Sequence, residues 1–514
     1  MPNILAYLVV FGYPVVVVVL FRKLPVPAAL TWSLLLGYLF LPTGVGVDVP
    51  ILPALDKVLI PSLSAAIMCF FVTRKARKPA PGRDPAARRR KTSLGTKVFR
   101  LLVAILIVTP FLTVSQNAEP IIVGLIYIPG MRLYDAFSII NASLVTILPL
   151  LLGRHFLNTP ESHMTLLRAI CLAGLAYSLL MMFEVRMSPQ LNRWIYGFFP
   201  HSFEQHIRAG GFRPLVFLKH GLWVGIFTAM AILSAVTLWL HDRAVGKRSP
   251  WFLAGVWLLV TLFFAKTVGA LILAVLMLLL LFFTRVRGQM IFAVCVASVV
   301  LLYPVLRTAG YIPVEEIYEF SKARSEDRAQ SFKFRLDNED ILLERASEKP
   351  VSGWGGWGRS RVYDAENSEE VTTADGAWII IIGQSGWLGY IAQFGLLTLP
   401  LLLLGLGSRR KLGLSLATSG LMVVLSINLI DLLPNGTLTP ITFLLAGALL
   451  GRYEHARAAL WGQKIAAAEQ QVKAKIKARQ PADPSPAFAA TPAAPPSGPA
   501  RHQRRSRSQP LTEE

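Results

Sequence analysis

The residues Ser352–Gly358 read S-G-W-G-G-W-G, and they lie inside a polar stretch, Thr308–Asp375, that separates long apolar segments of the chain. Acidic residues outnumber basic ones in this stretch, and Asp375 stands immediately before the next apolar run. Between Val314 and Lys349 the sequence has helical character, and Pro313 suits an early position of a helix. The stretch therefore predicts a large, partly helical loop between membrane segments.

The composition of the whole chain is typical of a membrane protein. Of its 514 residues, 54% are hydrophobic and only 16% are charged, whereas a soluble domain has about 25% charged residues. The apolar residues gather in repeated runs of about 17–25, which is the length of a helix that crosses a bilayer. We therefore expect an all-α polytopic membrane protein with about 13 transmembrane helices. They are placed near residues 4–20, 26–42, 57–73, 100–115, 137–153, 168–184, 214–240, 251–265, 267–284, 290–306, 377–407, 412–430 and 440–451.

The distribution of basic residues predicts the orientation of the chain. Its formal net charge is +22, which in a soluble protein would suggest nucleic-acid binding. Here the basic residues lie in alternate short loops, such as Arg22-Lys23 and 74–99, as the positive-inside rule requires of cytoplasmic loops. One orientation satisfies every short loop, with a periplasmic N-terminus and a cytoplasmic C-terminal tail. We therefore expect the basic loops to meet lipid, and no nucleic acid to be bound.

Composition also divides the chain into segments. Gly383 and Gly386 interrupt the longest apolar run, so a short re-entrant piece followed by a span is an alternative for 377–407. The expected segments are N-terminal transmembrane helices at 1–73, a basic cytoplasmic loop at 74–99, transmembrane helices at 100–307 with an external loop at 184–213, a large periplasmic loop at 308–376, C-terminal transmembrane helices at 377–451, a cytoplasmic helix at 452–480 and a disordered tail at 481–514.

Several kinds of site are missing from the sequence. The three cysteines, Cys69, Cys171 and Cys295, all fall in apolar runs, so a disulfide framework or a thiolate metal site is not expected. No His/Cys metal spacing, no phosphate-binding Gly-rich loop followed by Lys and no D-x-D pair occurs. These observations predict a metal-independent protein without a cofactor, and they argue against a nucleotide-sugar donor. A lipid-linked pyrophosphate donor needs no nucleotide site, and cationic side chains stabilise the charge on its leaving group.

The shorter external loop is rich in arginine and aromatic residues. Arg208 and Arg213 offer planar, bidentate donors that suit phosphate oxygens. Arg208 precedes Gly210-Gly211, where the backbone is able to turn tightly or approach a ligand. The alternative for the loop is an aromatic belt at the membrane interface with arginines facing headgroups.

Three further residues near the ends of predicted spans are ambiguous. Lys219 either binds substrate at membrane depth or extends to the outer interface. His220 is either a proton carrier or a hydrogen-bonded structural residue. Lys266 marks a very tight outside turn, and if that turn is sunken it points at the same cavity as Arg208.

The large loop supplies the remaining candidate residues. Arg335 and Arg345 lie in its helical part, where most other charges are expected on a solvated surface. Trp354 and Trp357 either line a glycan groove or anchor the loop at the membrane interface. Asp375 either acts as a general base toward a sugar hydroxyl or caps the helix that follows it.

These features together resemble the O-antigen ligase and polysaccharide polymerase superfamily of polytopic membrane glycosyltransferases. The similarity runs from about Arg208 to Leu397. It consists of R-A-G-G-F-R-P before a span, A-K-T-V-G-A between two spans, the W-G-G-W-G box and the final A-D-G-A-W-I-I-I-I-G-Q-S-G-W-L-G-Y. The spacing from Arg345 to Gly356 is similar to an arginine-ten-glycine pattern of polymerases.

The resemblance implies that Arg208 and Lys266 contact a donor pyrophosphate, and that the anomeric carbon is inverted. Lys266 stands where the ligase branch commonly has Arg, and Asp375 stands near the position of a histidine that ligases place late in the large loop. The second departure puts a standard ligase mechanism in doubt and leaves a polymerase or a divergent ligase open.

The sequence thus predicts a glycosyltransferase of the bacterial inner membrane. It would polymerise polyprenyl-pyrophosphate-linked oligosaccharide units on the periplasmic face. Arg208, Lys266 and either Arg335 or Arg345 would hold pyrophosphates, and Asp375 or His220 would accept the proton of the acceptor hydroxyl. The expected partners are the carrier-linked glycan, lipid and possible polysaccharide-assembly proteins. The alternatives are an O-antigen ligase that transfers glycan to a lipid A core, and a glycolipid transporter or flippase.

Overall fold

The computed structural model describes residues 1–48, 53–76, 93–208, 210–323, 326–407 and 412–479. The chain divides into two compact units, Met1–Trp461 and Gly462–Glu514. Most of the predicted basic loop at 74–99 and all of the predicted tail at 481–514 lie outside the described residues. Arg452–Arg479 were expected to be helical, and they belong to the last helix of the chain. The described residues of the second unit, Gly462–Arg479, form the C-terminal part of that helix.

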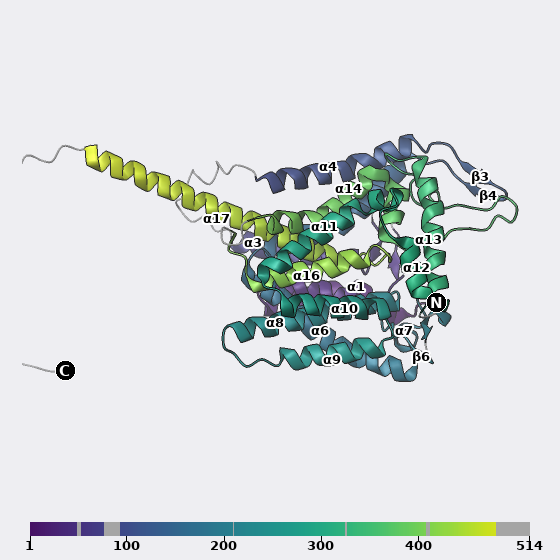
Figure 1. The fold of residues 1–514 in the computed structure, drawn as a ribbon, viewed down its shortest axis with the longest axis horizontal. Helices are drawn as coiled ribbons and strands as arrows, with labels where there is room; N and C mark the ends of the chain where they lie inside the picture. Colours follow the sequence, from purple (N-terminus) through teal and green to yellow (C-terminus); the bar gives the residue numbers. More distant parts are fainter. Residues whose placement is uncertain (49–52, 77–92, 209, 324–325, 408–411, 480–514) are drawn as a thin grey trace, which may run out of the picture. The chain divides into compact units, whose positions relative to one another are not determined.

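The first unit is built from long apolar helices (Figure 1). Each of them overlaps one of the expected spans. Seven helices of the described chain are long and apolar enough to cross a membrane, which confirms an all-α membrane protein, whereas the count of 13 crossings stays a prediction. The long helices are α1 (Ile4–Lys23), α2 (Val26–Phe40), α3 (Leu59–Ala76), α4 (Leu94–Ser115), α5 (Leu133–Phe156), α6 (Pro160–Met187), α8 (Gly221–Ala244), α9 (Trp251–Phe264), α10 (Val268–Phe283), α11 (Val286–Thr308), α14 (Ala377–Gly405), α16 (Leu416–Asp431) and α17 (Pro440–Arg479).

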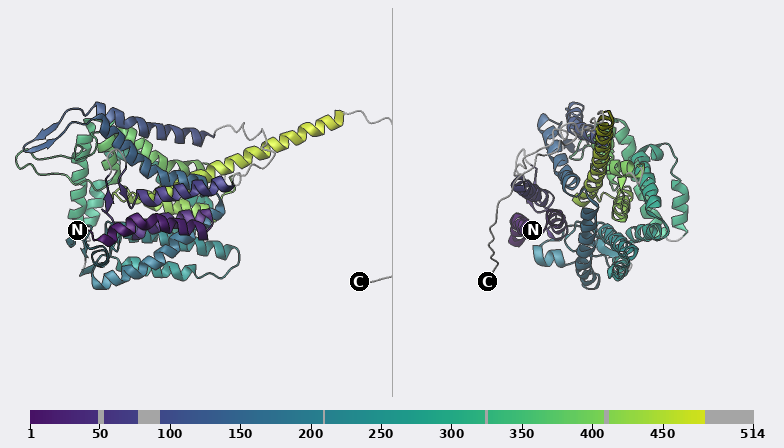
Figure 2. Two further views of the ribbon diagram at one scale, coloured as in Figure 1. Left: turned by 180° about the vertical axis from the view of Figure 1, so that it is seen from behind. Right: turned by 90° about the vertical axis from the view of Figure 1, so that its left-hand side faces the viewer.

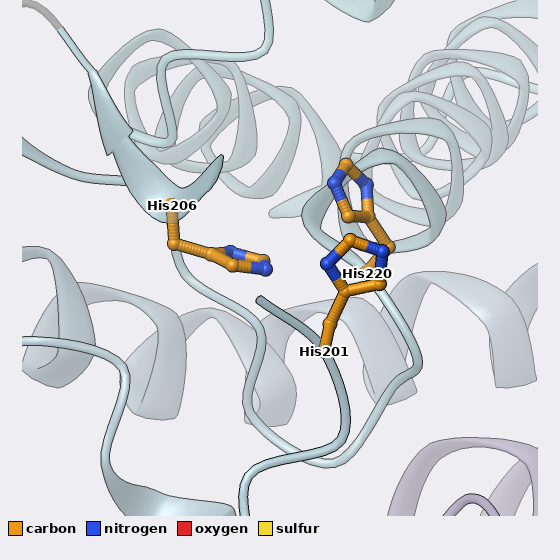
Figure 3. Close-up of side chains that lie close together, drawn as sticks. All are labelled: His201, His206 and His220. Carbon is orange, nitrogen blue, oxygen red and sulfur yellow. The ribbon is translucent and has the colours of Figure 1, made fainter. Parts of the chain in front are cut away.

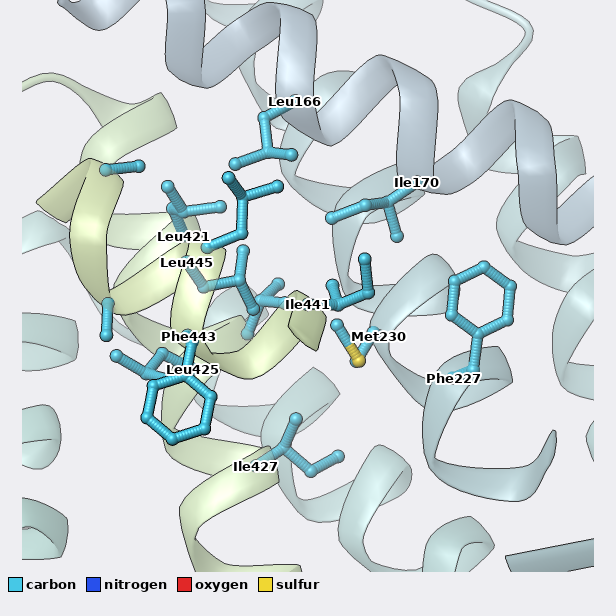
Figure 4. Packing of buried hydrophobic residues seen from close by; sticks show 14 of the residues in the cluster. Leu166, Ile170, Phe227, Met230, Leu421, Leu425, Ile427, Ile441, Phe443 and Leu445 are labelled. Carbon is cyan, nitrogen blue, oxygen red and sulfur yellow. The ribbon is translucent and has the colours of Figure 1, made fainter. Parts of the chain in front are cut away.

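Helix α8 is the most enclosed of the seven long apolar helices. In the most apolar 18-residue stretch of α8, 89% of the residues are buried, because α6, α9, α10 and α16 pack around this helix. A helix that is apolar on all sides is expected in such a central position. Figure 4 shows part of the core, where Phe227 and Met230 of α8 lie near side chains of α6, α16 and α17.

The shorter elements connect these helices. In Figures 1 and 2, α12 and α13 cross one end of the long helices, the end at which the N-terminus also lies. The two-stranded pairs are all antiparallel. The short elements are β1 (Gly46–Val47), β2 (Leu55–Asp56), β3 (Ile121–Val123), β4 (Ile126–Ile128), α7 (Leu191–Tyr196), the 3-10 turn η2 (Glu204–His206), β5 (Ile207–Arg208), β6 (Gly211–Phe212), α12 (Val314–Lys322) and α13 (Glu326–Ser347).

The loops predicted to be external contact one another. The Asn3 N–H donates to the Tyr196 carbonyl at 2.9 Å, and the Leu125 N–H donates to the Ser368 hydroxyl oxygen at 2.8 Å. Arg359 of the large loop donates to the Glu119 carbonyl at 2.9 Å. Loops that the charge pattern assigns to one side of the membrane thus meet at one end of the helices. Which side of the membrane this end faces stays a prediction from that pattern.

Helix α14 is interrupted at Gly386, where the backbone adopts φ 60° and ψ −166°. The break coincides with one of the two glycines that suggested an interruption, whereas Gly383 stays inside the helix. Breaking a helix frees carbonyl and N–H groups, and at membrane depth these groups need protein partners.

The S-G-W-G-G-W-G box provides those partners. The N–H groups of Trp354 and Gly355 donate to the carbonyls of Gly383 and Gln384, both at 2.9 Å. On the other side of the break, the Trp387 N–H donates to the Pro350 carbonyl at 2.8 Å. The two backbones approach so closely that a Cβ on Gly353 would lie 2.5 Å from the Gln384 carbonyl carbon. The box therefore closes the break in α14.

This packing predicts that Gly353→Ala destabilises the protein by about 2–5 kcal/mol. The substitution adds a backbone clash at a residue with φ +71°, and both a left-handed alanine and an overpacked site are costly. Gly356→Ala is the matched control, because nothing lies within 4 Å of its Cβ position. The measurement is the thermal unfolding midpoint of the purified variants in detergent. Equal midpoints for the two variants would contradict the role given to the box.

A buried carboxyl group fixes α13 against the long helices. The side chain of Glu339 is 12% exposed, and its Oε2 lies 3.9 Å from Nε of Arg307 at the end of α11. Burial raises the pKa of Glu339 to about 7, although the positive charge of Arg307 opposes this shift. Arg307 also pairs with Asp340 at 2.6 Å. Glu339 is thus held at a site that favours its protonated form.

We therefore predict that Glu339→Gln makes the protein more stable at pH 8 than the wild type but not at pH 5. The folded-state pKa lies above the usual value for Glu, so the folded protein binds an extra proton between about pH 4.5 and 7 and loses stability as pH rises through this window. The gain at pH 8 should be about 3 kcal/mol at most. Thermal midpoints at both pH values test it, with the exposed Glu344→Gln as the control. A gain of the same size at pH 5 would refute the explanation.

Candidate functional site

The residues singled out in the shorter external loop lie on a tight hairpin. Strands β5 and β6 pair Arg208 with Gly211, and Gly210 takes φ +69° in the turn between them. The ammonium of Lys266 donates to the Arg208 carbonyl at 3.0 Å. A Cβ on Gly211 would lie 2.3 Å from that ammonium nitrogen, so the Lys266 side chain passes close to the backbone of the hairpin. Lys266 therefore contacts the backbone of Arg208, whereas a cavity shared by the two side chains stays a prediction.

Glu184 holds the segment that follows this hairpin. Its fully buried carboxylate, at the end of α6, accepts hydrogen bonds from the N–H groups of Leu191, Leu215 and Val216 at 3.0, 2.8 and 2.7 Å. Val216 has φ 54°, which is strained for a β-branched residue. The sequence shows only an acidic residue at the edge of an apolar run, so this anchoring role was missed.

We predict that Glu184→Gln loosens the hairpin segment and lowers the thermal midpoint in detergent. An amide presents one acceptor oxygen in place of two, which leaves at least one buried N–H unpaired at a cost of about 1–3 kcal/mol. The exposed Glu204→Gln in the same loop is the control and should leave the midpoint unchanged. Two variants with the same midpoint as the wild type would show that Glu184 is not an anchor.

Arginine side chains from two loops come together beside the hairpin. Burial, together with the positive charges of Arg208 and Arg335, lowers the pKa of Arg213 to about 10. Arg335 of α13 pairs with Asp375, with 3.1 Å between Nε and Oδ2. Asp375 does not cap α14, whose N-cap is Gly376. Positive charges that disfavour one another are thus gathered where an anion would relieve their repulsion.

Three histidines lie next to these arginines. The rings of His201, His206 and His220 point toward one another (Figure 3), and one nitrogen of each lies within 4.8 Å of the others. Burial, together with the positive charges of neighbouring histidines and arginines, lowers the pKa of His206 to about 4 and that of His220 to about 3. These two rings are therefore neutral imidazoles near pH 7. Sequence reasoning missed His201 and His206, because only the fold brings them beside His220.

His220 and Lys219 precede α8 rather than lie within it. The expected span at 214–240 begins as a helix only at Gly221, and Nδ1 of His220 accepts the Leu222 N–H at 3.1 Å as its N-cap. Lys219 lines a cavity of about 280 Å³ together with Tyr38, Lys57 and Trp223. Lys219 thus faces a cavity beside the histidines, and His220 has a structural bond in addition to any chemical role.

The remaining candidates of the large loop form separate contacts. The Arg345 guanidinium stacks on the Trp354 ring at 3.4 Å from its centroid, and the Trp354 indole N–H donates to the Arg345 carbonyl at 2.7 Å. Trp354 is only 9% exposed, whereas Trp357 is 58% exposed. Trp357 lines a cavity of about 570 Å³ together with Asp48 and with residues of α5, among them Tyr134. Of the two tryptophans, Trp357 is therefore the one available to a ligand.

Comparison with known proteins finds one family whose model matches part of the chain. Residues 253–394 match the model of a family described as O-antigen ligase. The match contains Lys266, the large loop and the broken start of α14, and it ends before α16. It confirms the resemblance to the O-antigen ligase and polymerase superfamily, and at family level it supports a membrane glycosyltransferase that acts on a lipid-linked glycan. No curated protein matches the chain significantly.

Proposed function

We propose that the protein polymerises polyprenyl-pyrophosphate-linked oligosaccharide units on the periplasmic face of a bacterial inner membrane. The observation that carries the proposal is the cationic group beside the hairpin. The positive charges of Arg208 and Arg335 both lower the pKa of Arg213, and Lys266 donates to the Arg208 carbonyl. A pyrophosphate matches such a group in charge and in its need for several donors.

The proposed reaction breaks the bond between the anomeric carbon and the pyrophosphate oxygen, and the electron pair leaves with that oxygen. The acceptor hydroxyl oxygen forms the new glycosidic bond from the opposite face, so the anomeric carbon is inverted. Arg208, Lys266 and Arg335 would stabilise the charge that develops on the leaving pyrophosphate. Asp375 or His220 would take the proton of the hydroxyl. Asp375 already lies 3.1 Å from Arg335, which places one candidate base at the edge of the cationic group.

An O-antigen ligase is the second candidate function, because the matching family carries that description. A ligase uses the same carrier-linked donor but transfers the finished glycan to a lipid A core. The cationic group serves both reactions equally. The position of Asp375, where the resemblance implies a histidine in ligases, favours the polymerase.

The proposal predicts that Arg208→Ala and Lys266→Ala each reduce glycan assembly by about a hundredfold, the typical effect of removing one preorganised donor to developing negative charge. Lys266→Arg should retain much of the activity because it keeps the charge. The control is Arg243→Ala, since Arg243 lies at the far end of α8. The measurement is complementation of a gene deletion in the native host, followed by gels of surface glycans and of carrier-linked glycans.

The two glycan pools distinguish the candidate functions. Single units in place of long chains would support the polymerase. Full-length chains held on the carrier, with bare core at the surface, would support the ligase. Normal pools in the deletion strain would remove the support for both reactions.

A further inference from the structure

Two of the three histidines beside the hairpin have a buried ring nitrogen without a hydrogen-bond partner. His206 Nε2 and His201 Nδ1 are buried, and neither has a hydrogen-bond partner among the described residues. His206 itself is fully buried. Buried polar atoms in native proteins are nearly always paired, so two unpaired nitrogens in one cluster require an occupant.

The opposite sides of two of the rings are already fixed. His206 Nδ1 lies 3.3 Å from the Arg213 carbonyl, which only accepts, so this nitrogen carries the proton and Nε2 carries the lone pair. His220 uses Nδ1 to cap α8. A histidine that binds a metal typically donates its other N–H to a carbonyl in this way. His206 is thus oriented as a ligand with its lone pair directed toward the other two rings.

Three ring nitrogens are unable to satisfy one another. Each makes one hydrogen bond, either as donor or as acceptor, so pairing two of them leaves the third alone. A metal ion takes the lone pairs of all three at once. A water molecule is the competing occupant, because it donates to two nitrogens and accepts from one.

We propose that His201, His206 and His220 form a binding site for a divalent transition-metal ion of the Zn²⁺ class. Imidazole nitrogens suit zinc, and three histidines leave a fourth position open. Ligand nitrogens of a tetrahedral zinc ion are about 3.3 Å apart. The observed separations, all within 4.8 Å, close to that value through small side-chain rotations. This site is additional to the proposed glycosyl transfer, and its test does not depend on that reaction.

The ion would add a link between the hairpin and the start of α8. His206 immediately precedes β5, which carries Arg208, whereas His220 caps α8. Binding through Nε2 of His220 moves its proton to Nδ1 and releases the Leu222 N–H, one of the four N–H groups that every helix start leaves without an intrahelical partner. The nearby guanidiniums oppose a dication, so the open position suits an oxyanion. The ion would therefore fix the hairpin relative to α8.

The experiment measures metal binding to the full-length protein in detergent, purified without a polyhistidine tag and stripped with a chelator. The probe is Co²⁺, whose visible absorption reports four-coordinate nitrogen ligation. We expect one Co²⁺ per chain for the wild type, displaced by Zn²⁺. His206→Ala and His201→Ala should each weaken binding at least tenfold. His155→Ala is the matched control, because His155 is an exposed histidine at the end of α5.

The effect of Zn²⁺ on the thermal midpoint is a second measurement, which tests the proposal even if one variant folds poorly. Zn²⁺ should raise the thermal midpoint of the wild type and of His155→Ala, but not that of His201→Ala, whose side chain is only half-buried and therefore the safer substitution. No visible Co²⁺ band and no Zn²⁺ effect in the wild type would overturn the proposal and leave water as the occupant. Equal binding by His201→Ala and His155→Ala would overturn it as well, by placing the metal elsewhere.

Discussion

The large loop is fixed by the need to pair the backbone of a broken membrane helix. Gly386 interrupts α14, and the carbonyls of Gly383 and Gln384 are then available to the N–H groups of the tryptophan-glycine box. At membrane depth unpaired backbone groups cost several kcal/mol each, so the break and the box stabilise each other. Because the box is anchored there, Arg345 of α13 stacks on Trp354. The helix that carries Arg335 is therefore positioned by an interaction remote from Arg335 itself.

The cationic group depends on a different kind of support. Burial disfavours the charged form of Arg213, and the positive charges of Arg208 and Arg335 add to that cost. Two nearby charged side chains are bonded to neutral backbone groups. Lys266 donates to a backbone carbonyl, and Glu184 accepts from backbone N–H groups rather than pairing with the arginines. An arrangement that keeps positive charges together without neutralising them all is expected where an anionic ligand supplies the balance.

Much of the fold was predictable, because membrane helices are recognised from apolar length alone. The expected spans overlap every long helix of the described chain. Of the two glycines that suggested an interruption, Gly386 lies at the break and Gly383 does not. The sequence left open whether Lys266 turns toward Arg208 or is a plain turn residue. It did not show that His201 and His206 meet His220, or that Glu184 anchors Leu215 and Val216. Those contacts join loops distant in the chain, and neither periodicity nor charge pattern encodes them. Trp354 and Trp357 show the same limit, since two tryptophans three residues apart differ in exposure because one of them is covered by Arg345.

The ion pair between Arg335 and Asp375 connects binding to proton transfer in the proposed reaction. A carboxylate paired with a guanidinium has its oxygens engaged by the N–H donors of that guanidinium. A pyrophosphate that engages Arg335 competes with Asp375 for the same N–H donors. Substrate binding would then free the carboxylate oxygens to accept the proton of the acceptor hydroxyl. His220 lacks such a switch, because its Nδ1 is engaged by the start of α8. Within the proposed reaction, these contacts support Asp375 rather than His220 as the base.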